Sequence, residues 1–228
     1  YYKNQDMCEV LSDQENQQIL IRKCVIDMCA TLRRFDDVKR VIFTIDSSSW
    51  RYKLYDDYKY ALTRVKEPFY KQFLYCIDLF EKLLRDRGLI VSRVQGAEGD
   101  DLLYMWSLYF GYCKDEELVI ITGDSDIRQI MNKNVSIFNN NSKNLKFYCI
   151  PEREVFWNEY LDTDIQVVPT KPFEVLLYKV IMGDSSDNIP KLKNGFGQKA
   201  FDKFISFLSP YDEPGGGDLI ALARWIAR

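Results

Sequence analysis

Apolar and polar positions along the chain predict short buried strands that alternate with amphipathic helices. Apolar runs predict strands over 41–46, 89–94 and 118–122, with a further strand pair over 135–150. Apolar residues at helical spacing predict helices over 14–34, 68–88, from 98, from 125, from 172, over 200–208 and over 219–228. Strands that alternate with helices favour an α/β fold with a central, mostly parallel sheet wrapped by helices.

The composition fits one sizeable domain without a membrane segment. Of 228 residues, 46% are hydrophobic and 14% aromatic, which is enough for a real core. No apolar run approaches the roughly 20 residues of a membrane span, and no signal-peptide pattern is present. The six cysteines form no C-x-x-C pair. We therefore expect buried thiols in a reducing cytoplasm, and no membrane partner.

The sequence contains no histidine. This excludes Ser-His and Cys-His nucleophilic arrangements and histidine ligation of a metal. If the protein is an enzyme, carboxylates, lysines, tyrosines or a bound metal must carry the chemistry.

Carboxylates follow three of the predicted strands and one later helix, and they come in four groups. They are Asp46; Glu98, Asp100 and Asp101; Asp124 and Asp126; and Asp184 and Asp187. Each group alone is also explained by helix capping or by turn chemistry. Ligands of parallel sheets bind beyond the carboxyl ends of the strands, however, and clustered carboxylates repel one another unless cations offset them. Together the four groups therefore favour an oxygen-rich site for magnesium or manganese.

Such a site also changes how the net charge is interpreted. The overall charge is −3, from 31 basic and 34 acidic residues. Without the eight clustered acids, 31 basic residues face 26 acidic ones, which is compatible with a nucleic-acid partner. Two metal ions about 4 Å apart can activate a water and stabilise the leaving oxygen of a phosphodiester, and this chemistry needs no histidine.

Four segments, in order, resemble the motifs of the flap endonuclease and 5′→3′ exonuclease superfamily, whose bacteriophage members include a ribonuclease H of this type. The segments are FTIDSSSWR, QGAEGDDLLY with Gly99 where alanine is usual, ITGDSDIRQI, and MGDSSDNIPKLKNGFGQKAF. They cover roughly residues 19–207. The resemblance implies a PIN-like 5′-nuclease core over 1–170 and a helix-hairpin-helix DNA-binding region over 171–228.

The resemblance also implies roles for the clustered acids and two Mg²⁺ ions, with Mn²⁺ as an alternative. The first ion would be held by Asp46, Glu98, Asp100 and Asp124, and the second by Asp126, Asp184 and Asp187. Asp101 would orient ligands or metal-bound waters. Ligand sharing between the two ions stays open.

Two basic segments are expected to contact nucleic acid. In the hairpin, the resemblance implies a K⁺ ion and a site for a duplex phosphate, where glycines of positive φ expose backbone N–H groups; its residues are Lys191, Lys193, Gly195, Gly197 and Lys199. Residues 50–73 resemble the arch that admits a single-stranded 5′ end, with Lys53, Arg64 and Lys66 following phosphates. Lys59 and Arg51 are the expected contacts to the scissile phosphate. An amphipathic helix whose tyrosines only pack is the alternative for this segment.

The start of the chain departs from the family pattern. The family opens with a strand that ends in another metal-binding aspartate, whereas YYKNQDMCEVL holds no apolar strand. Either this strand lies upstream of Tyr1, or the protein lacks it, in which case the sheet loses a strand and the metal site a ligand. A parallel sheet without a core strand would expose apolar surface, so we expect the strand upstream of Tyr1.

The sequence as a whole predicts a metal-dependent, structure-specific 5′ nuclease that removes flaps or RNA primers in DNA replication. The expected substrates are DNA with a 5′ flap and RNA–DNA duplexes. A single-stranded-DNA-binding protein or a sliding clamp is the expected protein partner of a monomer at the nucleoid or a viral replication site. Two alternatives remain: a catalytically inactive nucleic-acid-binding relative, and a PIN-like ribonuclease that acts on single-stranded RNA.

Overall fold

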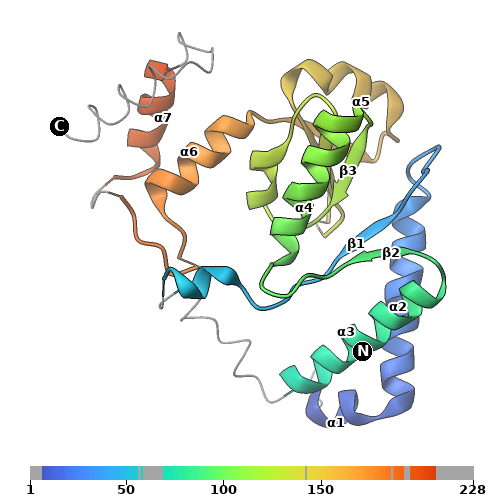
Figure 1. Cartoon of the computed structure of the whole chain (residues 1–228). Helices are drawn as coiled ribbons and strands as arrows, with labels where there is room; N and C mark the ends of the chain where they lie inside the picture. The colour runs from blue at the N-terminus through green and yellow to red at the C-terminus, as the bar shows by residue number, and fades with distance from the viewer. Residues whose placement is uncertain are drawn as a thin grey trace.

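Two β-sheets with helices around them form the computed structural model of the chain, which describes residues 7–55, 58, 69–141, 143–185, 187–192 and 196–208 (Figure 1). β1 (Ile42–Thr44) and β2 (Ile90–Ser92) form a parallel pair. The second sheet has the order β3-β4-β5-β6, with bounds β3 (Leu118–Ile121), β4 (Val135–Asn139), β5 (Leu145–Cys149) and β6 (Ile165–Pro169). The predicted α/β class is confirmed. Within the described residues, however, the strands are divided between two sheets.

Three of the four strand pairs are parallel, as the alternation of strands and helices predicts. β3 pairs with β4 and β5 pairs with β6 in parallel, whereas β4 and β5 form the predicted antiparallel pair. β6 was not predicted. It places Ile165 directly against Leu145 at the outer strand of the sheet.

The helices agree with the prediction over most of the chain. Their bounds are α1 (Met7–Ser12), α2 (Gln14–Leu32), α3 (Tyr70–Asp86), α4 (Gly99–Leu108), α5 (Glu154–Tyr160), α6 (Pro172–Met182) and α7 (Gln198–Leu208). Shorter helical turns are η1 (Trp50–Lys53), η3 (Tyr109–Lys114), η4 (Asp126–Ile130) and η5 (Pro151–Arg153). The sequence did not predict α1 or α5, and the helix predicted over 219–228 lies outside the described residues.

Local chemistry explains where several helices begin and end. The side chain of Asp13 accepts a hydrogen bond from the backbone N–H of Asn16 at 2.9 Å and caps α2. Gly88 follows α3 with φ of 76°, a conformation that favours glycine and stops the helix. Pro172 occupies the first turn of α6, where its missing N–H costs nothing.

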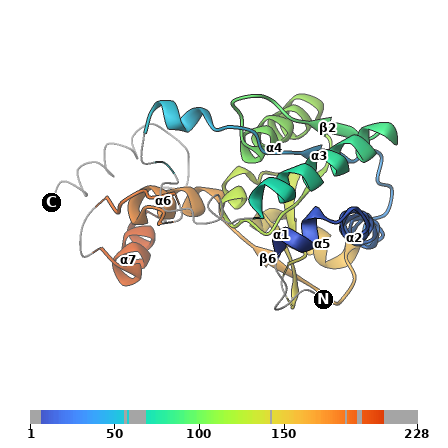
Figure 2. The same ribbon diagram turned by 90° about the horizontal axis from the view of Figure 1, so that it is seen from below.

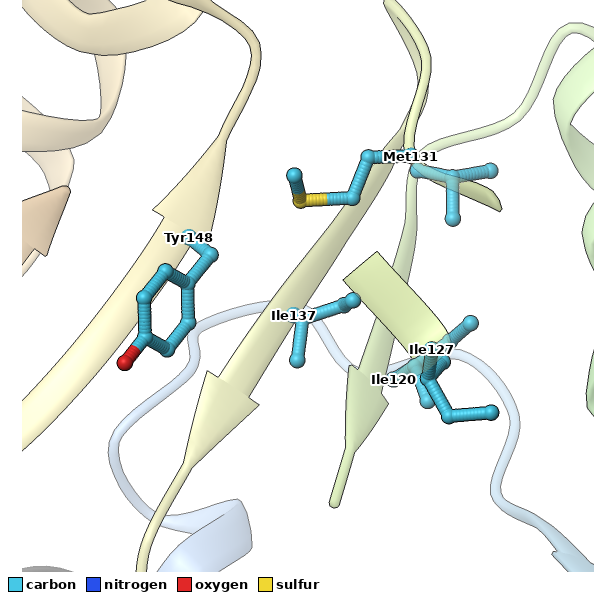
Figure 3. Packing of buried hydrophobic residues seen from close by; sticks show 6 residues of the cluster. Ile120, Ile127, Met131, Ile137 and Tyr148 are labelled. Atoms are coloured by element: carbon cyan, nitrogen blue, oxygen red, sulfur yellow. The ribbon is translucent and has the colours of Figure 1, made fainter. Parts of the chain in front are cut away.

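The core of the four-stranded sheet holds the segment that follows β3. Figure 3 shows Ile120, Ile127, Met131, Ile137 and Tyr148 gathered between the strands and η4. Of these, Ile137 is 1% exposed. Because Ile120 precedes and Ile127 follows the turn that carries Asp124, the same apolar cluster anchors both ends of that turn.

A separate apolar cluster joins α6 to α7 at one end of the molecule. Leu177 and Ile181 of α6 pack with Phe196, Phe201 and Phe204. Figures 1 and 2 both place these two helices at the end opposite α1, α2 and α3. The two helices thus share a small apolar core of their own, apart from the cores of the four-stranded sheet.

The expectation of buried thiols is wrong for three cysteines. Cys76 and Cys149 are buried, whereas Cys24, Cys29 and Cys113 are exposed. Among the described residues, no helix is long and apolar enough to cross a membrane.

Candidate metal centre and nucleic-acid interface

The turn after β3 arranges two neighbouring aspartates through backbone hydrogen bonds. The N–H of Asp124 donates to Oγ1 of Thr122 at 3.1 Å, and the N–H of Asp126 donates to Oδ1 of Asp124 at 2.8 Å. Asp124 thus uses one carboxylate oxygen to start η4 at Asp126. The Asp124 side chain is exposed, whereas Asp126 is half-buried. Both carboxylates lie beyond the carboxyl end of a parallel strand, as predicted.

A lysine of α6 lies between this turn and the acidic segment that follows α6. Nζ of Lys179 is 2.8 Å from Oδ1 of Asp126 and 2.7 Å from Oδ2 of Asp184. Burial disfavours the charged ammonium, but the hydrogen bonds to both carboxylates outweigh this cost and raise the pKa of Lys179. A cation therefore already bridges two of the predicted metal ligands.

The backbone around Asp184 forms a closed turn. Asp184 and Ile189 exchange two backbone hydrogen bonds, at 2.9 and 2.7 Å. Gly183, with φ of 68° and ψ of −172°, directs the chain into this turn in a region that only glycine readily adopts. A Cβ at Gly183 would lie 2.5 Å from the carbonyl oxygen of Ile189. Asp187, which is half-buried, lies within the same turn.

Asp46, two residues after β1, contacts the start of α4. Its Oδ1 accepts a hydrogen bond from the N–H of Gly99 at 2.6 Å. A Cβ at Gly99 would lie 2.9 Å from that oxygen. An added Cβ at residue 99 would therefore require the Asp46 carboxylate to shift from this hydrogen bond.

Glu98 is buried and accepts hydrogen bonds from three side chains. Its Oε2 accepts from Oγ of Ser49 at 2.9 Å, from the hydroxyl of Tyr58 at 2.9 Å and from a guanidinium nitrogen of Arg51 at 2.7 Å. Only 8% of Glu98 is exposed. These donors compensate the desolvation of the carboxylate and fix its orientation.

The guanidinium group of Arg51 that binds Glu98 also binds Asp101. Arg51 contacts both oxygens of Asp101, at 2.7 and 3.0 Å, while Oδ2 also accepts from the N–H of Glu98 at 3.0 Å. Burial raises the pKa of Asp101, but the hydrogen bonds from Arg51 and the Glu98 N–H outweigh it, so the pKa is lowered from 3.8. Asp101 thus fixes Arg51 and the backbone of Glu98, and its role in orienting a metal ligand stays a prediction.

The structure brings the predicted carboxylates together in pairs. Across the residues that the structure describes, no three acidic or cysteine side chains are grouped so that they could hold one ion. The full ligand sets of the two ions, which include the exposed Asp100, therefore stay predictions.

The expected nucleic-acid contacts are only partly described. Arg51 binds Glu98 and Asp101, so its contact to a phosphate stays a prediction. Gly197 has no positive φ, contrary to expectation, and its carbonyl oxygen accepts from the N–H groups of Ala200 and Phe201 at the start of α7. The exposed lysines of these segments are Lys53, Lys191 and Lys199. Five expected contacts lie outside the described residues: Lys59, Arg64, Lys66, Lys193 and Gly195.

Sequence reasoning missed three side chains of the site. Ser49 and Tyr58 bind Glu98, and Lys179 binds two aspartates. Lys179 was detectable as the only charged residue in the run VLLYKVIM, since a lone base in an apolar helix usually has a partner. Ser49 and Tyr58 carry no comparable signal.

The sequence of the chain is similar to that of a known protein family. Residues 1–158 match the model of the 5′-3′ exonuclease N-terminal resolvase-like domain. The 5′-3′ exonuclease of Buchnera aphidicola is 26% identical over 160 residues, which are 69% of this chain and 50% of that protein. The 5′-3′ exonuclease of Bacillus subtilis is 28% identical over 159 residues, with 70% and 48% covered. The chain thus spans about half the length of these relatives.

Solved structures show the same fold at lower sequence identity. The D15 protein of T5 has a TM-score of 0.60 and 18% identity over 84% of this chain and 68% of that chain. A second structure, of T5 5′-exonuclease, has a TM-score of 0.59 and 18% identity, with 88% and 73% covered. The match over residues 1–158 shows that this chain belongs to the 5′-3′ exonuclease family.

Proposed function

We propose that the chain is a divalent-metal-dependent, structure-specific 5′ nuclease that removes flaps or RNA primers during DNA replication. The observation that carries this proposal is the cation between Asp126, which lies beyond the carboxyl end of the parallel strand β3, and Asp184, which follows α6. An ammonium there indicates that the carboxylates form a site for positive charge.

The donor set suits hard cations such as Mg²⁺ and Mn²⁺, because it consists of carboxylate oxygens. The proposed ligands are Asp46, Glu98, Asp100 and Asp124 for one ion, and Asp126, Asp184 and Asp187 for the other. When bound, such ions lower the pKa of a water and neutralise charge on the leaving oxygen of a phosphodiester. The related T5 D15 protein was co-crystallised with metal ions, which supports the proposal.

The chain's own residues hold the ligands in place. Ser49, Tyr58 and Arg51 orient the Glu98 carboxylate through hydrogen bonds, and Asp101 holds Arg51 from the other side. Lys179 offsets the repulsion between Asp126 and Asp184.

We assign duplex binding to the helix-hairpin-helix segment formed by α6, α7 and the residues between them. Lys191 and Lys199 are exposed, and they add attraction to phosphates that is independent of base sequence. A D15 flap endonuclease variant of T5, with 19% identity and a TM-score of 0.52, was solved as a pseudo-enzyme-product complex with DNA and metal ions. K⁺ in the hairpin stays part of this proposal.

The test is cleavage of a 5′-labelled flap duplex and of a matched RNA–DNA hybrid, with Mg²⁺ and with EDTA. We expect cleavage only with Mg²⁺. Asp124→Asn should abolish cleavage while duplex binding is kept or strengthened, since the change removes negative charge from the site. Full activity of Asp124→Asn would contradict the assigned centre.

A binding-only role is the second candidate, because the described carboxylates are arranged in pairs and no three could share one ion. Duplex binding without cleavage at any Mg²⁺ or Mn²⁺ concentration would favour this candidate. The same assay therefore separates the two functions.

A further inference from the structure

We propose that Lys179 is a built-in counter-ion that holds Asp126 and Asp184 together in the metal-free protein and competes with a divalent cation for these two carboxylates. The inference rests on the proposed metal centre. It assigns a positioning role to a residue that sequence reasoning did not select.

The contacts of Lys179 join two segments that are far apart in the sequence. Asp126 begins η4, and Asp184 follows α6, which packs against η4. The Lys179 side chain is 30% exposed, Asp126 29% and Asp184 12%. The contacts are thus partly shielded from water, where an ion pair is stronger than on an open surface.

Charge explains why a cation is needed at this position. Asp126 and Asp184 each lie within 3 Å of the same nitrogen atom, so their carboxylates approach each other closely. Without Lys179 the two negative charges would repel and one segment would move away. With Lys179 the start of η4 and the segment after α6 stay close together in the absence of metal.

The same contacts set a competition. Oδ1 of Asp126 and Oδ2 of Asp184 cannot give the same lone pairs to an ammonium and to a divalent ion. Lysine has a flexible four-carbon chain, so its ammonium can leave while α6 stays in place. A divalent ion must first displace the ammonium of Lys179 from the two carboxylates. Its apparent affinity is therefore lower than it would be without Lys179.

Lys171 provides a matched control on the same helix. It precedes Pro172 and pairs with Glu174 at 3.4 Å, with both side chains exposed. Lys171→Met removes the same charge from α6 and touches none of the predicted ligands.

The experiment measures Mn²⁺ binding by the loss of the free-ion electron paramagnetic resonance signal, together with thermal unfolding in EDTA. We expect Lys179→Met to bind Mn²⁺ about tenfold more tightly than the unaltered chain and to have a lower Tm in EDTA. Lys171→Met should match the unaltered chain in both measurements. Lys179→Gln, whose amide can still donate to a carboxylate, gives the same test if the methionine variant does not fold.

Two negative outcomes are distinguishable. Equal Mn²⁺ affinity for Lys179→Met and Lys171→Met, with clear binding to both, would overturn the competition and leave the metal centre intact. Absence of Mn²⁺ binding in every variant would overturn the proposed function and, with it, this inference.

Discussion

Replacing Arg51 with methionine tests whether the buried Glu98 depends on its cation. The substitution keeps an unbranched side chain but removes three charge-assisted hydrogen bonds, at 2.7, 3.0 and 2.7 Å. The side chains of Glu98 and Asp101 are only 11% and 22% exposed, so water cannot fully replace the guanidinium.

The burial of Glu98 and Asp101 sets the expected loss of folding stability. Removing one partner of a fully buried ion pair costs about 3–5 kcal/mol. Arg51 is itself 31% exposed, so we expect a smaller loss of about 2 kcal/mol. For a chain of this size, that loss corresponds to a fall in Tm of about 4–8 °C.

Arg34→Met is the control, because Arg34 is 32% exposed but its partner Asp164 is 57% exposed. A surface pair of this kind contributes about 0–1 kcal/mol. Thermal and urea unfolding of both variants at pH 7 give the comparison. Equal destabilisation by the two substitutions would refute the anchoring role of Arg51.

The effect of Arg51→Met also depends on pH. The pKa of Asp101 in the folded chain is lowered from 3.8, so its pairing with Arg51 stabilises the fold above the unfolded pKa. This contribution is lost as the pH falls through the folded pKa. We therefore expect the stability difference between the variant and the unaltered chain to be full at pH 7 and to shrink below about pH 4. If the stability difference between Arg51→Met and the unaltered chain stayed constant down to pH 2, the pairing with Asp101 would not contribute to it.

Three further predictions concern backbone, thiol and DNA contacts. Gly183→Ala should destabilise the fold by about 3 kcal/mol or more in urea unfolding, because a Cβ would lie 2.5 Å from a backbone oxygen at a φ of 68°; a loss below 1 kcal/mol would refute the strain. Burial raises the pKa of Cys149 to about 11, so Ellman's reagent should modify the exposed Cys113 in the native state and Cys149 only after unfolding. Rapid native reaction of Cys149 would contradict its burial. Lys191→Ala should weaken duplex binding equally for all base sequences and make its salt dependence shallower, and an unchanged salt slope would exclude Lys191 from the DNA path.

The sequence predicted the elements with strong periodicity and missed those without it. α3 is strongly amphipathic and α6 is largely apolar, and the structure confirms both; it also confirms α2, although Ile19 and Ile26 of its predicted apolar face are exposed. β6 is short and takes its hydrogen-bond partners from β5, and the short helix α5 buries Trp157 against Phe138 and Phe147 of the sheet. Because such elements depend on tertiary contacts rather than on local pattern, their residues alone do not reveal them.

The sequence indicated which acidic residues belong to the candidate site. It did not indicate which basic side chains pair with them. The ends of the predicted strands indicated Asp46 and Asp124, since ligands of parallel strands bind beyond their carboxyl ends, and the structure places the two residues after strands of different sheets. The pairing of Arg51 with Glu98 and Asp101 was not predictable, because sequence patterns do not distinguish a phosphate contact from an internal ion pair. The pairing of Lys179 was not predictable either, because Asp126 begins η4 and Asp184 follows the end of α6.

The division into two sheets has a consequence for how the proposed metal centre responds to heating. The β1–β2 pair that precedes Asp46 and Glu98 has three residues per strand, and Ile90 is 45% exposed. The sheet that carries Asp124 includes fully buried residues such as Phe138. Amide hydrogens of β1 and β2 should therefore exchange through local opening, whereas those of β4 should exchange only on global unfolding. The proposed nuclease activity would then be lost before melting, and a reversible state with an intact four-stranded sheet would lie between the native and the unfolded chain.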